Sequence, residues 1–358
     1  MTDFLIIGGG IAGISAAARL SALGDVTVLE AEDALGYHAS GRSAAMFVET
    51  YGKPSIIVLN RASKDYLMTA NGGVLSPRGL LLLGGEETRE VFLQDMKDMS
   101  LHGISVDEAR GYVPILDPGA VTMAAHYADA WDIDTDLLLQ NFARTARANG
   151  GKIITRARVE QIARTADGWQ VTTSTGAHQG RILVNAAGAW VDQIAVLAGI
   201  APLGVTPYRR SMARIPAPAG LDVTTWPMMF GPGESWYAKP DAGALLVSPA
   251  DEDPCEPHDA WADDMVLAEG LARYEAAVTE PVTRLLGNWA GLRSFSPDHS
   301  LVIGPAPDDP TFFWLAGQGG YGMQTSPAAS HLAADLIAGR APEIDAATVA
   351  ALSPERFT

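Results

Sequence analysis

Two glycine-rich turns stand near opposite ends of this 358-residue chain. The first has the spacing Gly-x-Gly-x-x-Gly and directly follows the apolar run Phe4–Ile7. Gly8 permits a tight turn, Gly10 lets the backbone approach a pyrophosphate, and Gly13 lets a helix pack closely on a strand. The pattern therefore predicts a strand, a turn and a helix over Ile11–Leu23, with a dinucleotide bound at the helix N-terminus.

Glu30 follows the short apolar run Val26–Leu29, which we expect to be the second strand. An acid at this place binds ribose hydroxyls and repels a 2′-phosphate, so the turn favours FAD or NAD over NADP. The second turn, Gly317–Gln324, follows Phe312–Leu315 and precedes a helix that would run toward Gly339. A dinucleotide site built from both ends, around a large insertion, indicates a flavoenzyme rather than a nicotinamide dehydrogenase.

The elements that must position these turns predict an α/β fold. The amphipathic helix Thr135–Asn149 is followed by short strands at Lys152–Ile154, Val159–Thr165 and Gln170–Thr173. An apolar strand from Arg181 then runs into small residues and a helix. This antiparallel excursion predicts a glutathione-reductase-type Rossmann domain for FAD.

The rest of the chain is expected to form an inserted α+β substrate domain with a mixed or antiparallel sheet. Residues 53–149 are interpreted as helical segments, and residues 206–295 as strands that roof a substrate cavity. The expected division gives 1–52, 150–205 and 296–358 to the FAD-binding domain, and 53–149 and 206–295 to the substrate-binding domain. The length allows two domains.

Composition excludes several classes of function. The formal net charge of −17 argues against a nucleic-acid partner, whose phosphates demand a basic face, and against anionic lipid. Cys255 is the sole cysteine, so no intramolecular disulfide can form. We see no signal peptide and no membrane span, and expect a soluble cytoplasmic protein. Cys255 and His258 lack a second ligand pair, so no metal is expected.

Several longer segments resemble the D-amino acid oxidase superfamily of FAD-dependent oxidoreductases. The resemblance covers nearly the whole chain and is closest to the bacterial D-arginine dehydrogenase-like D-amino acid dehydrogenases. The segments that carry it are Gly36–Ala45, Tyr51-Gly52, Leu75–Arg78, Asp132–Asp136, Val184–Trp190, Arg209–Ser211, Trp236–Asp241, Trp289–Phe295 and Gln318–Ser326.

The resemblance implies a non-covalent FAD held by residues from both ends of the chain. Beside Gly8, Gly10, Gly13 and Glu30 it assigns to the cofactor Ile11, Ala12, Ala31, Ser40, Gly41, Arg42, Ser43, Ala44, Ala45, Val159, Ala187, Gly188, Trp190, Gly319, Gly320, Tyr321, Gly322, Met323 and Gln324.

The same resemblance implies a substrate site with two parts. The catalytic residues that would bind the substrate carboxylate are Tyr51, Arg210, Tyr237 and Arg293, although Arg209 could replace Arg210. The pocket for the rest of the substrate would comprise Met46, Val48, Leu80, Met228, Phe230, Gly320 and Gln324.

This chain departs from the arginine-accepting relatives on the expected pocket wall. They carry a carboxylate where this chain has Leu80, a histidine at Met46, a threonine at Val48 and a smaller aliphatic residue at Phe230. A cationic side chain would lose its counter-ion, unless a shift of the main chain brought in another acid such as Glu49. The wall therefore favours an apolar side chain.

These residues suit oxidation of an amino acid by transfer of hydride from Cα to flavin N5. A guanidinium grips a carboxylate through two parallel hydrogen bonds and stays charged. A neutral amine needs no catalytic base, whereas a 2-hydroxy acid does, and no histidine is expected in the pocket. His38 lies in the cofactor loop, either as a ligand or as a structural hydrogen-bonding residue. The helix that opens at the turn ending at Gln324 would stabilise negative charge on the reduced flavin.

The expected function is oxidative deamination of a D-amino acid to an imino acid and then a 2-keto acid. Two alternatives stay open for the same site: a secondary amine such as an N-methyl amino acid or proline, and a 2-hydroxy acid. A non-catalytic flavin-binding redox sensor or assembly factor is a third. The electron acceptor is left open among oxygen, a quinone and a carrier protein.

Overall fold

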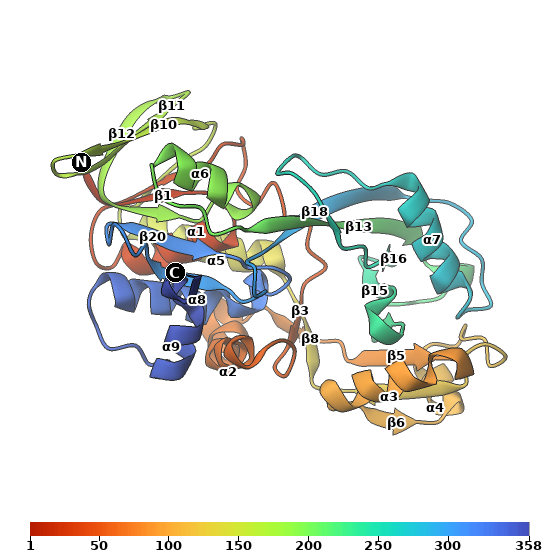
Figure 1. Cartoon of the computed structure of the whole chain (residues 1–358). Helices are drawn as coiled ribbons and strands as arrows, with labels where there is room; N and C mark the ends of the chain where they lie inside the picture. The colour runs from red at the N-terminus through yellow and green to blue at the C-terminus, as the bar shows by residue number, and fades with distance from the viewer. Residues whose placement is uncertain (358) are drawn as a thin grey trace.

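A largely parallel sheet built from both ends of the chain forms the body that holds the two termini (Figure 1). The computed structural model describes residues 1–357, without the side chain of Ala219. The N-terminal and C-terminal apolar runs both pair with the strand that ends at Asn185: Ile7 lies beside Leu29 and Asn185, and Asn185 lies beside Trp314. The strands of this sheet are β1 (Thr2–Ile7), β2 (Val26–Leu29), β9 (Lys152–Ile154), β10 (Val159–Thr165), β11 (Gly168–Thr173), β12 (Gly176–Asn185), β19 (Val302–Pro305) and β20 (Phe312–Ala316).

Helices cover this sheet and bury their small and apolar faces against it. The central α1 packs on α5, and α8 packs on both α1 and α2. Phe47, Phe142 and Phe313 lie with these helices in one core. The helices of this body are α1 (Ile11–Leu20), α2 (Pro54–Thr69), α5 (Thr135–Ala148), α6 (Val191–Leu197), α8 (Gly322–Ile337) and α9 (Ala346–Leu352).

A second, mixed sheet forms the other body. Most of its strands are antiparallel, while β14 runs parallel to β5. The long pair β13–β18 extends from the first body into the second (Figure 1). This body contains β5 (Leu80–Gly84), β6 (His102–Ile104), β7 (Met123–Tyr127), β13 (Thr206–Pro216), β14 (Met228–Phe230), β15 (Tyr237–Asp241), β16 (Ala244–Ser248), β17 (Asp253–Pro254), β18 (Gly287–Phe295), α3 (Arg89–Asp98), α4 (Val106–Tyr112) and α7 (Asp264–Glu275).

A small antiparallel sheet lies between the two bodies (Figure 1). It consists of β3 (Met46–Val48), β8 (Ala130–Ile133) and β4 (Leu75–Pro77), with β8 in the middle. Met46 and Ser76 both lie opposite Asp132 in its register. Two segments that cross between the bodies, through β4 and β8, therefore meet in this sheet, whereas β13 and β18 cross separately.

The α/β fold class is confirmed, but the helical interpretation of residues 53–149 is wrong in its middle. Strands β4 to β8 lie between α2 and α5. The run from Leu80 to Leu83 has no helical or strand period, because β5 is buried completely between β14 and β7. A continuous apolar run of this kind fits a buried strand as well as a helix.

Two helices of the 53–149 range pack with the first body rather than with the second. α2 packs on α8, and α5 packs on α1. A boundary that assigned 53–149 wholly to the substrate-binding domain would remove both helices from their core. We therefore propose that α2 and α5 belong with the FAD-binding domain.

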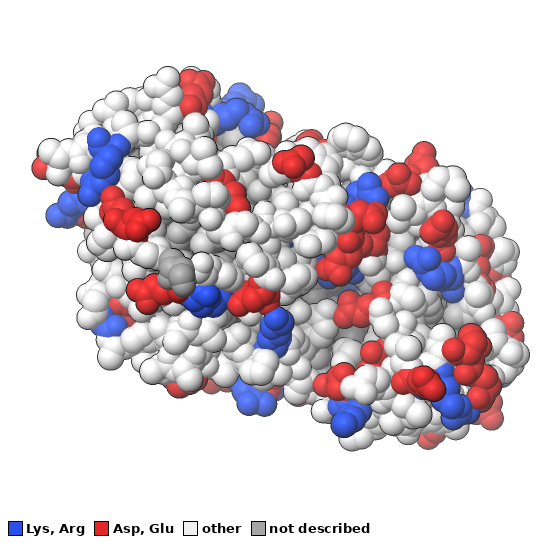
Figure 2. Space-filling view, viewed as in Figure 1, with Lys and Arg blue, Asp and Glu red and all other residues white. Residues whose placement is uncertain are grey.

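The protein carries a net negative charge, but its surface is not uniformly acidic. On the face drawn in Figure 2, basic side chains are scattered among acidic ones. Within the part of the chain that the structure describes, no helix has the length and apolar character needed to cross a bilayer.

Candidate active site

The larger cavity of the protein lies at the carboxyl ends of the parallel strands. It has a volume of about 340 Å³ and is lined from both termini, by Gly8, Glu30 and Gly320 among others. Ligands of open α/β sheets bind at this edge, because the strands there are followed by loops and helix N-termini. The position agrees with the cofactor site that the sequence predicts.

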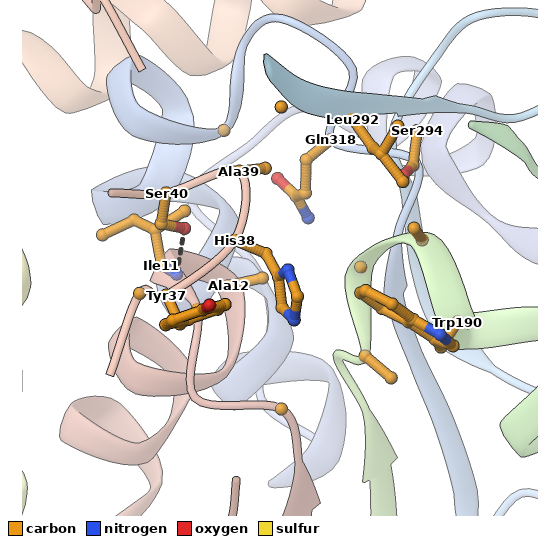
Figure 3. A pocket seen from close by; sticks show the side chains of 18 of the residues that line it. Ile11, Ala12, Tyr37, His38, Ala39, Ser40, Trp190, Leu292, Ser294 and Gln318 are labelled. Atoms are coloured by element: carbon orange, nitrogen blue, oxygen red, sulfur yellow. Dashed lines mark hydrogen bonds between the residues drawn. The ribbon is translucent and has the colours of Figure 1, made fainter. Parts of the chain in front are cut away.

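The first glycine turn has the geometry that a pyrophosphate requires. Gly8 has φ +110°, and a Cβ atom there would overlap the carbonyl oxygen of Ala186. A Cβ at Gly13 would overlap the carbonyl oxygen of Gly8, so this glycine packs the helix on the strand rather than lining the cavity. The hydroxyl of Ser40 accepts a hydrogen bond of 3.0 Å from the N–H of Ile11, at the start of α1 (Figure 3).

Glu30 closes the turn at the end of β2. Its carboxylate accepts hydrogen bonds from the N–H groups of Gly9 (2.5 Å) and Glu32 (2.8 Å), and the side chain is buried in the cavity wall. An acid here suits ribose hydroxyls, as the sequence suggests.

The second glycine turn brings the start of α8 to the same cavity. Gly319, Gly320, Gly322 and Met323 line it. The side-chain amide nitrogen of Gln318 is buried without a hydrogen-bond partner, and Figure 3 shows this side chain pointing into the cavity. An unpaired buried donor facing a cavity fits a bound group rich in acceptors, such as FAD.

Most of the residues assigned to the cofactor from sequence lie on the cavity walls, but three do not. Gly13, Gly41 and Tyr321 line neither this cavity nor the smaller one described below, and Ala45 and Gln324 line only the smaller one. Tyr321 instead packs against the ring of Tyr51, at 5.4 Å between centroids.

Arg42 is at the cavity wall but its guanidinium is engaged by protein groups. It donates to the carbonyl oxygens of Ala260 (2.8 Å) and Ala290 (2.9 Å) and pairs with Asp259. Tyr37 also donates to Asp259. Through its contacts with Asp259 and Ala260, Arg42 holds the loop around residue 259 at the wall of the cofactor cavity.

His38 sits beside the same cavity as a contact residue. Its Nε2 lies 3.1 Å from Glu32 Oε1, and its ring packs on Trp190 at 4.7 Å between centroids. Figure 3 shows His38 and Trp190 side by side at the wall. Both of the roles considered for His38 remain compatible with this position.

A second cavity of about 110 Å³ adjoins the first. Tyr237, Arg293 and Gly320 line both, so these residues stand where the two meet. All seven residues expected to form the substrate pocket lie on this smaller cavity, together with Tyr51. No histidine is among its lining residues in the described chain.

Arg293 and Arg210 reach the cavities from the paired strands β18 and β13. Arg210 lies opposite Gly291, and residues 291 and 293 share one face of β18, so both guanidiniums lie on the cavity side. Within the described residues Arg293 makes no hydrogen bond or ion pair. Burial lowers its pKa, but Tyr237, Tyr51 and nearby acids outweigh this and raise it, so the group stays charged.

The structure distinguishes Arg210 from its neighbour. Arg209 points to the other face of β13 and pairs with Asp251 (3.2 Å) and Asp253 (2.7 Å). Arg210 is buried, its Nε and Nη1 have no partner, and its Nη2 lies 4.0 Å from Glu252. Of the two, Arg210 therefore has free donors for a ligand.

Other donors around the smaller cavity are also available. Gln324 accepts a hydrogen bond from the N–H of Val48 at 3.2 Å, while its amide nitrogen is buried without a partner. The hydroxyl of Tyr237 makes no hydrogen bond within the described residues, and the side chain is buried. Donors without acceptors, near the unpaired donors of Arg210 and Arg293, favour a carboxylate ligand.

One carboxylate lies on this wall that the sequence analysis missed. Glu234 lines the smaller cavity and accepts a hydrogen bond of 2.7 Å from the hydroxyl of Tyr51. Glu49, the other acid that a shift of the main chain could bring to the pocket, instead pairs with Lys64 at 2.9 Å and Arg61 at 3.3 Å. No local motif marks Glu234, because only the turn after β14 brings it to the cavity.

The remaining wall of the smaller cavity is apolar. Met46, Val48, Leu80, Met228 and Phe230 pack together there with Met99, which the sequence analysis also missed. The four residues at which this chain differs from the arginine-accepting relatives, Leu80, Met46, Val48 and Phe230, therefore lie close together. In the described residues, no group of three or more His, Cys, Asp or Glu side chains is arranged to hold a metal ion.

The fold and the paired cavities define a two-body flavin-dependent oxidoreductase. The chain belongs to the DAO family of FAD dependent oxidoreductases, whose family model matches residues 3–336. Its cofactor is therefore FAD, which the residues of the larger cavity fit.

Three relatives are distant in sequence but match nearly the whole of this chain. FAD-dependent oxidoreductase domain-containing protein 1 of Xenopus laevis is 25% identical over 94% of this chain and 79% of its own length. Glycine oxidase from Geobacillus kaustophilus superposes with a TM-score of 0.84 at 21% identity, covering 98% of both chains. L-proline dehydrogenase from P. horikoshii gives a TM-score of 0.83 at 23% identity, covering 99% of this chain and 97% of the other.

Proposed function

We propose that this flavoenzyme oxidises the Cα–N bond of a D-amino acid with an apolar side chain. The product would be an imino acid, which water hydrolyses to a 2-keto acid. The observation that carries the proposal is a pair of arginines with unpaired donors, Arg210 on the larger cavity and Arg293 where the two cavities meet, next to the largely apolar wall of the smaller cavity. The D configuration rests on the resemblance to the bacterial D-arginine dehydrogenase-like enzymes.

In this proposal the protein acts mainly by positioning. Arg293 and Arg210 would bind the substrate carboxylate through parallel hydrogen bonds, with Tyr237 as a further donor. Holding the carboxylate fixes Cα relative to the neighbouring cavity, which removes much of the entropic part of the barrier. Bound FAD supplies the hydride acceptor, N5. The apolar wall around Leu80 would receive the side chain and exclude water.

The proton balance favours an amine over an alcohol. A neutral amine carries its own lone pair and releases its proton to water once hydride has left Cα. A 2-hydroxy acid would need a base at its hydroxyl, and the lining of the smaller cavity offers no histidine for this task in the described chain. Glu234 is engaged by Tyr51.

A small secondary amine is a second candidate. The smaller cavity, about 110 Å³, is well below the ~300–1,000 Å³ of pockets for drug-sized ligands. The names of two structural neighbours, glycine oxidase and L-proline dehydrogenase, point to small or secondary amines as well. N-methylglycine and proline would fit the same clamp.

Anaerobic bleaching of the bound flavin tests these candidates. The panel should contain D-leucine, D-methionine, D-phenylalanine, D-arginine, their L-enantiomers, L-proline, N-methylglycine and D-lactate. We expect D-leucine or D-methionine to bleach the flavin fastest. Faster bleaching by proline or N-methylglycine would favour the second candidate. Bleaching by D-lactate alone would reject amine oxidation, and bleaching by dithionite alone would indicate a non-catalytic flavoprotein.

A further inference from the structure

A partly buried cluster of three charged side chains lies next to the smaller cavity, outside its lining. We call Asp132, Arg78 and Lys239 the Asp132 cluster. One carboxylate oxygen of Asp132 accepts a hydrogen bond of 2.6 Å from Lys239 Nζ. The other accepts one of 2.6 Å from Arg78 Nε and lies 2.5 Å from Arg78 Nη2.

The cluster is well shielded from water. The side chains of Asp132, Arg78 and Lys239 are 15%, 11% and 9% exposed. The remaining donor group of Arg78, Nη1, is bound by the carbonyl oxygens of Thr224 (2.7 Å) and Trp226 (2.9 Å). Removing these three charged side chains from water costs free energy, which offsets the attraction between them. We therefore expect the Asp132 cluster to specify one arrangement of the chain rather than to add stability.

The arrangement that it specifies concerns three strands of the pocket wall. Met46 lies directly opposite Asp132 in the β3–β8 register. Lys239 follows Tyr237 by two residues on β15, so their side chains share one face of that strand. Arg78 joins the end of β4 to the start of β5. Asp132 therefore links the small middle sheet to two strands of the mixed sheet.

Backbone contacts around Arg78 extend the same link to the side-chain wall. The N–H groups of Arg78 and Gly79 both bind the carbonyl oxygen of Ala130, and the carbonyl oxygen of Gly79 binds the N–H of Met228. Met228 in turn lies beside Leu80 in the β14–β5 register. Movement at Asp132 would thus move the apolar wall as well as Tyr237.

We propose that Asp132 is a positioning residue, which fixes the Tyr237 hydroxyl and the apolar wall relative to Arg293 through Lys239 and Arg78. The proposal rests on the proposed function in so far as it treats the smaller cavity as a carboxylate pocket. Without the carboxylate, two neighbouring cations would repel each other at the junction of the sheets, and the pocket would lose its shape before the FAD site did.

Binding of benzoate to the FAD-loaded protein tests the proposal without turnover. Benzoate is a carboxylate with no oxidisable Cα–H, and its binding can be followed by the change in flavin absorbance. We expect Asp132→Asn to raise the Kd for benzoate at least tenfold with an unchanged FAD content. Lys239→Met should raise it severalfold, and Lys239→Arg should restore it to within twofold of the unmodified protein.

Asp335→Asn is the matched control, because Asp335 is a buried carboxylate paired with an arginine (Arg340, 2.7 Å) near the end of α8. It should lower the melting temperature and leave the benzoate Kd unchanged. With an oxidised amine, Asp132→Asn should raise KM at least tenfold and change kcat less than threefold, a split that loss of stability alone would not give.

Each result decides the proposal. If Asp132→Asn lowers the melting temperature but leaves the Kd for benzoate unchanged, the Asp132 cluster has only a structural role and the proposal is overturned. If that variant does not fold, the comparison of Lys239→Met with Lys239→Arg decides, and equal Kd values overturn the proposal. Absence of benzoate binding to the unmodified protein overturns it too. Failure of every amine to bleach the flavin, with the benzoate pattern intact, would reject the proposed function alone.

Discussion

The hydroxyl of Tyr51 donates a hydrogen bond of 2.7 Å to the carboxylate of Glu234 on the wall of the smaller cavity, which Arg293 also lines. Burial, and then the charge of Glu234, raise the pKa of Tyr51 well above its ordinary value. The hydroxyl therefore stays protonated, and remains a donor, throughout the neutral range. Glu234 thereby occupies the hydrogen bond that the sequence analysis assigned to a substrate carboxylate.

We expect Tyr51→Phe to lower kcat/KM about ten- to a hundredfold, because Glu234 loses its donor beside the substrate carboxylate and a hydrogen bond to a charged group contributes roughly 1.5–3 kcal/mol. The measurement is steady-state turnover of the best amine from the bleaching panel. Tyr66→Phe is the control, since Tyr66 stacks on Phe142 in the core of the first body. Equal kcat/KM values in the two variants would remove Tyr51 from the site.

Arg209 and Arg210 provide a test with neighbouring residues. We expect Arg210→Met to lower kcat/KM by about 2–5 kcal/mol in barrier terms, because a buried charge partner for the substrate is lost. Arg209→Met should leave kcat/KM within about threefold and lower the melting temperature instead, because it breaks the pairs with Asp251 and Asp253. The opposite pattern would show that Arg209 holds the substrate.

We expect FAD to be released intact by acid or mild heat. A covalent link of the cysteinyl kind needs a thiol at the cofactor, and Cys255, the sole cysteine, lines neither cavity. Its sulfur lies 3.8 Å from the carbonyl oxygen of Pro207, and burial raises the pKa of the thiol. A yellow precipitate after acid treatment, with a colourless supernatant, would contradict non-covalent binding.

The nucleotide-binding elements could be predicted from sequence because their signals are local. Val26–Leu29, Lys152–Ile154 and Val159–Thr165 form strands with the expected bounds. The glycine turn restricts the backbone between Ile7 and Ile11 to one path. In α5, apolar residues recur with the helical period of 3.6 residues. Such features depend on neighbours along the chain.

The pocket wall could be named from the resemblance, but its electrostatics could not. Glu234 reaches the cavity only because β14 pairs with both β5 and β15, a pairing that no local pattern encodes. Asp132 likewise meets Lys239 across 107 positions of sequence. Side chains that act through pairing between distant strands are invisible to motif spacing.

Replacement of Arg293 by lysine tests the carboxylate clamp itself. Lysine keeps the charge but lacks the planar fork, so positioning and charge pairing fail together. We expect kcat/KM to fall by roughly 3–5 kcal/mol in barrier terms, with unchanged FAD content. Arg340→Lys is the matched control, because Arg340 is half exposed and pairs with the buried Asp335 near the end of α8. Near-normal turnover in Arg293→Lys would place carboxylate recognition elsewhere.

Leu80 tests the specificity of the apolar wall. A buried cation without a counter-charge costs several kcal/mol, whereas an apolar group gains about 25 cal/mol for each Å² buried. Glu234 is the acid on the wall, and Tyr51 already binds one of its oxygens. We therefore expect D-leucine, D-methionine or D-phenylalanine to exceed D-arginine and D-lysine in kcat/KM.

Leu80→Glu should shift this order toward the cationic substrates by about tenfold or more, since an ion pair would form where the side chain is buried. Leu80→Gln is the matched control, because it has nearly the same shape without the charge, and it should weaken apolar substrates without favouring cations. If the unmodified protein prefers D-arginine, Glu234 rather than Leu80 governs the choice. In that case Glu234→Gln should abolish the preference, whereas under our expectation it leaves the ranking of apolar over cationic substrates intact.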